Sequence, residues 1–163
     1  TKPIGIGVVL AAYMRGIVNP LDFEDAVKIM LTSNQIASKV FLKNNITSIT
    51  DVTGFGLARH ALNLTIPFGA KININDTPVV NGAIKYLNKG VYSSLSLSNK
   101  EAIHFSGSIQ NKDNIIFDPQ TSGGLLAAVN SKKSNKIIEE LKSNNCFASV
   151  IGEVVEKAEI VLN

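Results

Sequence analysis

A near-continuous apolar run over residues 4–12 most constrains how this chain folds. Ile6, Val8 and Val9 stand in it with only apolar or small residues around them. A segment without a polar side must be covered on both faces, so another layer of structure must lie on each side. The run is shorter than the roughly 18 residues of a membrane span. We therefore predict a strand over residues 4–12 that is buried on both faces.

Composition favours one compact domain without a nucleic-acid or membrane partner. The chain has 163 residues, of which 45% are hydrophobic and 18% charged, so a core is affordable and disorder is not expected. The net charge is +3, and the one local cluster of cations is Lys132, Lys133 and Lys136. No aromatic residues interleave with it, so we interpret the cluster as the exposed face of a helix.

Cysteine usage and the first residues bear on compartment and on domain boundaries. Cys146 is the only cysteine, so no intrachain disulfide can form, which fits a reducing, cytoplasmic environment. No signal peptide precedes the apolar run. The sequence opens on Thr1 without an initiator methionine. We expect a fragment cut at a domain boundary, in which residues 1–163 form a single domain.

Periodicity and chain breakers predict an α+β fold with one mixed sheet covered by helices. Asn19 and Pro20 are typical of a helix start, and residues 92–114 read as a long loop. The predicted helices cover about 20–43, 56–65, 78–90 and 131–144, the last capped by Ser131. The predicted strands cover 46–52, 71–76, 115–117 and 124–129, with 149–155 and 160–162 as a closing hairpin.

The first informative segment is Asp51-Val52-Thr53-Gly54-Phe55-Gly56, between a predicted strand and a predicted helix. A carboxylate at a strand end lies at the sheet edge, where open sheets bind ligands. Asp51 would then be a hard oxygen ligand for a Mg²⁺ bridged to phosphate. The same residues also suit a simple helix cap and turn. The residues alone leave both interpretations open.

The second informative segment is Asp118-Pro119-Gln120-Thr121-Ser122-Gly123-Gly124. Asp-Pro starts a turn, the hydroxyls can cap local amides, and the two glycines allow another backbone to approach closely. A phosphate-binding nest uses the same residue types. Neither segment is a Walker P-loop, because the chain has no G-x-x-x-x-G-K-[ST] pattern.

Together these segments resemble the selenophosphate synthetase (selenide, water dikinase) family. The match rests on D-V-T-G-F-G at 51–56, D-P-Q-T-S-G-G at 118–124, the opening T-K-P-I-G-I-G at 1–7 and the closing I-G-E-V at 151–154. The likeness spans essentially the whole chain. Asn34 and His60 are further matches.

The resemblance implies a C-terminal α+β domain of the aminoimidazole ribonucleotide synthetase-like superfamily, partly like a ferredoxin fold. In that superfamily an N-terminal domain dimerises and binds ATP, and the C-terminal domain closes over the cleft. The family converts ATP, selenide and water to selenophosphate, AMP and phosphate with Mg²⁺. The resemblance thus implies ATP and Mg²⁺ as cofactors and a homodimer of the full-length protein.

Carried over by position, Asp51 matches a family aspartate that helps to coordinate Mg²⁺ on the ATP phosphates. Thr53, Gly54 and Gly56 would shape its loop and contribute to cofactor binding. The family's reactive Cys or Sec and its Lys lie in the N-terminal domain, so we assign no catalytic residue here. A domain with this single carboxylate is expected to be inactive alone.

Two departures from the family pattern stand out. Arg59 replaces a glycine that commonly precedes the histidine, and Ser93-Ser94-Leu95 stands where Gly-Gly-Thr is common. Arg59 places a bulky cation where close packing is usual, and the second departure leaves the geometry and role of residues 91–105 open.

The remaining polar candidates have ordinary explanations beside functional ones. We interpret His60 as a hydrogen-bonded, partly buried residue rather than a catalytic base, and His104 as solvated. Lys2 is either a solvated lysine or a group that reaches a phosphate across a cleft. Cys146 is interpreted as structural.

Two other functions remain open. One is a domain of a related small-molecule kinase or synthetase of the same superfamily. The other is a stand-alone, non-catalytic module that binds a nucleotide or a partner subunit.

Overall fold

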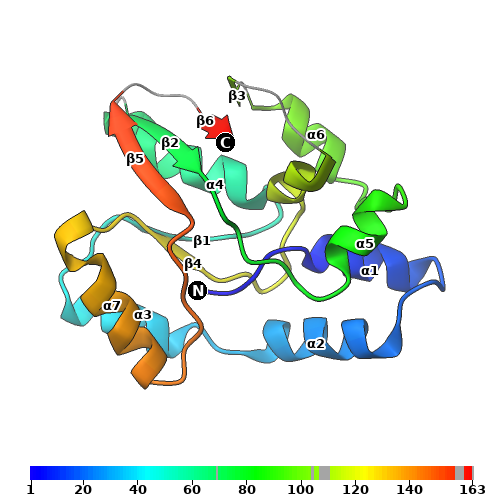
Figure 1. The fold of residues 1–163 in the computed structure, drawn as a ribbon, viewed down its shortest axis with the longest axis horizontal. Helices are drawn as coiled ribbons and strands as arrows, with labels where there is room; N and C mark the ends of the chain where they lie inside the picture. The colour runs from blue at the N-terminus through cyan, green and yellow to red at the C-terminus, as the bar shows by residue number, and fades with distance from the viewer. Residues whose placement is uncertain (69, 104, 107–110, 157–159, 163) are drawn as a thin grey trace.

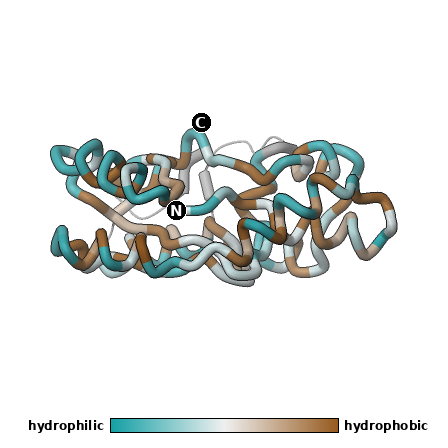
Figure 2. Tube along the Cα trace, turned by 90° about the horizontal axis from the view of Figure 1, so that it is seen from below, coloured by the Kyte–Doolittle hydropathy of each residue, from teal (hydrophilic) through white to brown (hydrophobic). Residues whose placement is uncertain are grey.

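The computed structural model in Figure 1 describes residues 1–68, 70–103, 105–106, 111–156 and 160–162. Seen edge-on in Figure 2, the chain forms a thin, elongated body. Its elements in chain order are α1 (Ile6–Met14), α2 (Pro20–Leu31), α3 (Gln35–Lys43), β1 (Ile49–Asp51), α4 (Gly56–Thr65), η1 (Ile66–Phe68), β2 (Ala70–Ile74), α5 (Ala83–Asn88), α6 (Ser96–Glu101), β3 (Phe105–Ser106), η2 (Asn111–Phe117), β4 (Leu125–Ala127), α7 (Ser131–Ser143), β5 (Gly152–Glu156) and β6 (Ile160–Leu162).

The described strands form two sheets. A four-stranded sheet has the order β3-β6-β2-β5, in which β2 runs antiparallel to β5 and parallel to β6. A separate antiparallel pair joins β1 to β4, with Thr50 opposite Leu126. The α+β class and the mixed sheet are therefore confirmed. The expectation of a single sheet is wrong, because β1 and β4 pair only with each other among the described strands.

The expected closing hairpin is also wrong, although both of its strands exist. β2 lies between β5 and β6 and pairs with each of them, so the two last strands do not contact as neighbours (Figure 1). Local sequence could not reveal this insertion, because β2 comes some eighty residues earlier in the chain.

The apolar run at residues 4–12 is mainly helical, which overturns the predicted strand. Ile4 makes only an isolated parallel bridge with Val79, and α1 begins at Ile6. Val8 and Val9 are fully buried in the main core, so α1 is a helix that is apolar on nearly every side. Such a helix and a doubly buried strand have the same hydrophobic pattern.

The long predicted helix is two helices. Asn19 caps α2 by accepting a hydrogen bond from the Leu21 amide, and Pro20 opens the helix, as predicted. The chain then turns extended at Thr32, and α3 starts after Asn34. Asn34 is only half-buried, and its side-chain amide donates to the Gly123 carbonyl at 2.9 Å.

Several other predicted bounds shift. The region taken as a long loop contains α6 and β3, and residues 115–117 belong to the 3-10 helix η2 instead of a strand. α5 begins at Ala83, later than expected. Asn130 rather than Ser131 caps α7, by accepting from the Lys132 amide. His104 lies outside the described residues.

The core has two clusters. The larger one gathers α1, α4, α5 and η2 around side chains such as Val9, Tyr86 and Phe117. The smaller one lies where α3 and α7 cover the β1–β4 pair, around Phe41 and Leu141. This second cluster positions the strand that ends at the first sequence motif.

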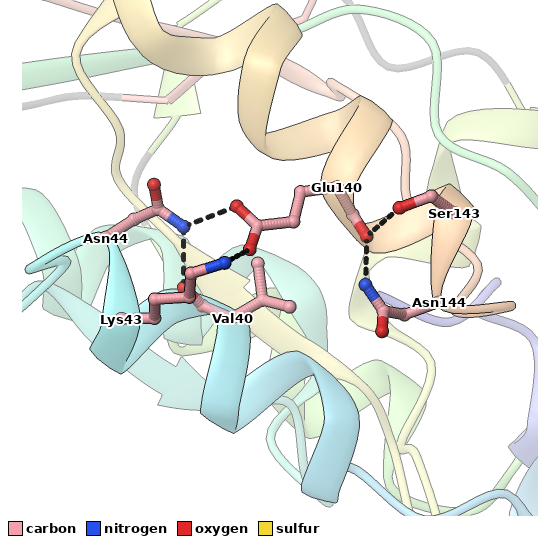
Figure 3. Close-up of polar contacts among 6 residues, drawn as sticks. All are labelled: Val40, Lys43, Asn44, Glu140, Ser143 and Asn144. Carbon is pink, nitrogen blue, oxygen red and sulfur yellow. Dashed lines mark hydrogen bonds and ion pairs between the residues drawn. The ribbon is translucent and has the colours of Figure 1, made fainter.

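Glu140 joins α3 to α7 at the rim of the smaller cluster (Figure 3). Its carboxylate accepts from Lys43 Nζ at 2.6 Å and from Asn44 Nδ2 at 2.9 Å. These hydrogen bonds hold the pKa of Glu140 below its usual value. Its carbonyl accepts from the side chains of Ser143 and Asn144, so the end of α7 is held as well.

Gly7 lies inside α1, where alanine ordinarily stabilises a helix by about 1 kcal/mol. We expect the opposite from Gly7→Ala, a loss of about 1–3 kcal/mol in the free energy of unfolding. The new Cβ would lie 2.6 Å from Asp118 Oδ1 and 2.7 Å from the Pro119 carbonyl oxygen. Chemical denaturation measures the change.

Gly54→Ala is the matched control, since no atom lies within 4 Å of the Cβ it would add. Its free energy of unfolding should stay near the wild-type value. A Gly7→Ala protein as stable as the wild type would show that α1 does not approach residues 118–119 so closely.

Candidate functional site

Asp51 is the last residue of β1, and its side chain is exposed. It lies opposite Leu125 in the β1–β4 register, and the next amide, that of Val52, donates to the Gly124 carbonyl at 2.9 Å. The end of the first motif strand is thus bonded to the end of the second motif. The structure brings together two segments that are about seventy residues apart in the sequence.

Thr53 anchors the loop after Asp51. Its amide donates to His60 Nε2 at 3.1 Å, and its hydroxyl lies 2.9 Å from the same nitrogen. Its carbonyl accepts from the Gln120 amide at 3.1 Å. The loop is therefore held by α4 through His60 and by the second motif through Gln120.

His60 is buried and hydrogen-bonded, which confirms that part of its predicted role. An Nε2 that accepts from the Thr53 amide must be unprotonated. Burial lowers the pKa of His60, and the nearby Asp51 carboxylate partly opposes this change. The neutral imidazole ring of His60 is thus suited to hold the loop in place.

The two glycines of the first motif have different surroundings. Gly56 has a φ of 77°, and a Cβ there would lie 2.8–2.9 Å from the backbone of Ile116 and Phe117. Its amide already donates to the Thr53 carbonyl at 3.0 Å. Gly54 instead faces open space. The backbone therefore leaves no room for a side chain at Gly56 but does leave room for one at Gly54.

Residues of the second motif cap the N-terminus of α1. Gln120 Oε1 accepts from the amides of Gly5 and Ile6 at 3.1 and 3.3 Å, and Asp118 Oδ2 accepts from the Gly7 amide at 2.8 Å. These are amides that a helix cannot satisfy internally. The motif predicted to be either a demanding turn or a phosphate nest thus has an architectural role at Asp118 and Gln120.

Asp118 is a buried acid, only 1% exposed. Burial raises its pKa from 3.8 to about 7, although the amides of Val8 and Gly7 and the side chains of Gln120 and Ser96 favour the charged form. Its second oxygen, Oδ1, has no hydrogen bond of good geometry among the described residues. The carboxyl therefore changes charge near neutral pH while it caps a helix.

The other sequence candidates make contacts within the protein. Lys2 Nζ donates to the Ser122 carbonyl at 2.7 Å, so it closes the second motif, and burial lowers its pKa. Cys146 is half-buried, and burial raises the pKa of its thiol. Arg59 donates to the Ala102 carbonyl at 2.8 Å, which ties α4 to the end of α6. The lysine cluster of α7 is exposed, as expected: Lys132, Lys133 and Lys136.

Asn99 is the site residue that sequence reasoning missed. It lies on α6, in the segment predicted to be a loop, and its side-chain amide contacts both motif regions. The sequence around Asn99 does not predict this role, because its side chain contacts residues that are distant in the sequence.

The carboxylates of the described residues bear on the predicted metal site. Among the described residues, no group of three or more His, Cys, Asp or Glu side chains converges as a metal cage would require. Asp51 alone presents an exposed carboxylate at the loop. One carboxylate fits Mg²⁺ when phosphate oxygens and waters complete its shell. Within the described part of the chain, no helix is both long and apolar enough to cross a membrane.

The chain belongs to the family described as AIR synthase related protein, C-terminal domain, whose sequence profile matches residues 1–163. Solved structures share the fold. A thiamine-monophosphate kinase from Stenotrophomonas maltophilia K279a superposes with a TM-score of 0.68 at 11% identity, over 99% of this chain and 48% of that one. An E. coli hydrogenase maturation protein superposes at 0.64 with 15% identity, over 99% of this chain and 43% of that one.

Within that class, the sequence is similar to proteins named selenide, water dikinase. The protein of Clostridioides difficile strain 630 is 34% identical over 168 residues, and that of Bdellovibrio bacteriovorus is 33% identical over 167. Both alignments cover 98% of this chain and 48% of the relative. The chain thus spans about half the length of these curated relatives.

The raised pKa of Asp118 predicts a specific pH dependence. Between pH 3.8 and about 7 the folded protein binds more protons at this site than the unfolded chain, so its free energy of unfolding falls as the pH rises. Asp118→Asn keeps an acceptor for the Gly7 amide but cannot ionise. The stability of the variant relative to wild type should therefore rise from pH 4 to pH 8.

Urea denaturation at several pH values measures this difference. Asp76→Asn is the control, because Asp76 is an exposed aspartate that follows β2. Parallel stability curves for wild type and Asp118→Asn would mean that Asp118 has an ordinary pKa.

Proposed function

We propose that the chain is the C-terminal domain, residues 1–163, of a two-domain selenophosphate synthetase. The observation that carries the proposal is whole-chain similarity to selenide, water dikinases that are about twice as long. The full-length protein would convert ATP, selenide and water to selenophosphate, AMP and phosphate. In this proposal it is a cytoplasmic homodimer without nucleic-acid or membrane partners.

Asp51 is the residue of this domain proposed to meet Mg²⁺-ATP. It is exposed at a strand end, next to a loop that three separate contacts hold in place. Among the described residues, no salt bridge involves Asp51, so its carboxylate is suited to share a Mg²⁺ with phosphate oxygens. Bound Mg²⁺ neutralises phosphate charge and orients the phosphates.

Other residues would position Asp51 or face the nucleotide. Thr53 and Gly56 fix the loop through the contacts described above, and Gly54 leaves room for a ligand against the backbone. The reactive Cys or Sec and its Lys are proposed to lie in the N-terminal domain. The domain by itself then has no catalytic group and an incomplete metal shell.

Calorimetric titration of the isolated chain with Mg²⁺-ATP tests this half-site. No heat of binding is expected from the wild type or from Asp51→Ala, because a single carboxylate holds Mg²⁺-ATP too weakly. Clear binding that Asp51→Ala abolishes would contradict the half-site and favour a stand-alone nucleotide-binding module.

In the two-domain protein, Asp51→Asn should lower selenide-dependent AMP formation by about tenfold or more. Its stability should be unchanged, because the side chain is exposed. Asp76→Asn is the matched control and should retain activity. ADP formation with another small substrate, and no AMP formation with selenide, would favour a related kinase or synthetase instead.

A further inference from the structure

We propose that Asn99 is a positioning residue that fixes the Asp51–Gly56 loop, and thereby the carboxylate of Asp51. This inference rests on the proposed function of that loop. It also assigns a role to the 91–105 segment, which carries no recognisable motif.

The geometry of Asn99 uses its full donor capacity. Nδ2 donates to the Gly54 carbonyl at 2.8 Å and to the Phe117 carbonyl at 3.0 Å. A side-chain amide has two N–H groups, and here each one has its own acceptor. Asn99 is only 9% exposed, so water cannot easily replace these hydrogen bonds.

The two acceptors belong to the two regions that form the site. Gly54 is the centre of the first motif, and Phe117 immediately precedes Asp118 of the second. They are 45 and 18 residues from Asn99 in the sequence. Asn99 therefore bridges segments that approach each other but are not continuous.

The Gly54 contact matters because Gly54 lies between the two fixed points of the loop, Thr53 and Gly56. Thr53 is held by His60 and by Gln120, but no atom lies within 4 Å of the Cβ position at Gly54. Phe55 is 64% exposed, and its side chain makes a tilted contact with the ring of His60, at 6.4 Å between centroids. Asn99 thus supplies a fixed point at the exposed turn next to Asp51.

The backbone of Asn99 is itself held by the helix α6. Its own amide donates to the Leu95 carbonyl, within the turns of α6. One helical turn earlier, Ser96 is buried on the same face. α6 thus reaches the first motif at Gly54 and the residue before the second motif, Phe117, through Asn99.

Amide hydrogen exchange in the isolated chain tests the inference without any ligand. The Gly56 amide, which donates to the Thr53 carbonyl, reports whether the turn is closed. Asn99→Ala should speed its exchange by about tenfold, since a lost hydrogen bond lets the turn open. Asn99→Ser keeps one donor and should give a smaller increase. It replaces the alanine variant if that variant folds poorly.

Asn44→Ala is the matched control. Asn44 Nδ2 also donates two hydrogen bonds, to Val40 and Glu140, but between α3 and α7. The variant should leave Gly56 exchange unchanged. Unchanged exchange in a folded Asn99→Ala or Asn99→Ser protein, or an equal rise in Asn44→Ala, would overturn the inference.

Kinetics of the two-domain protein separate this inference from the proposed function. Asn99→Ala should raise the KM for Mg²⁺-ATP severalfold more than Asn44→Ala does, because the carboxylate is no longer held in place. If Asp51→Asn lowers activity but Asn99→Ala leaves this KM unchanged, the positioning role is wrong and the proposed function stands. If Asp51→Asn has no effect while Asn99→Ala still speeds Gly56 exchange, the proposed function of the loop is wrong and the anchoring contact alone stands.

Discussion

The fold depends on Gln120, a buried side chain that joins three segments. Its Oε1 caps the amides of Gly5 and Ile6, its Nε2 donates to Asp118, and its own amide holds the Thr53 carbonyl. A helix as apolar as α1 cannot begin in the core unless the free amides at its N-terminus find acceptors. Because the acceptors come from the second motif, burying α1 also fixes the loop that carries Asp51.

This arrangement explains why the two motifs occur together. Their strands β1 and β4 pair only with each other among the described strands, and hydrogen bonds from Gln120 and Asn99 join the loop after β1 to the segment before β4. The second motif thus acts as a frame, and the first presents its carboxylate from that frame. In the proposed enzyme this rigidity would let Asp51 meet Mg²⁺-ATP without ordering the loop at that moment.

The sequence predicts those parts of the fold and the site that depend on neighbouring residues, and not those that depend on contacts between distant residues. The features that depend on local patterns are confirmed. They are the α+β class, the helix start at Asn19–Pro20, the helix α4 and the position of Asp51 at a strand end. The helix at residues 6–14 was missed because its caps are more than 110 residues away in the sequence. The interposed β2 and the role of Asn99 were missed for the same reason.

Native-state hydrogen exchange of the Gly5 and Ile6 amides tests most directly whether Gln120 organises the fold. If Gln120 caps α1 as described, these amides exchange only when the whole domain unfolds, and their rates follow the global unfolding free energy as urea is added. Exchange that is fast and insensitive to urea would mean that the start of α1 opens locally. It would contradict a buried cap at the centre of the domain.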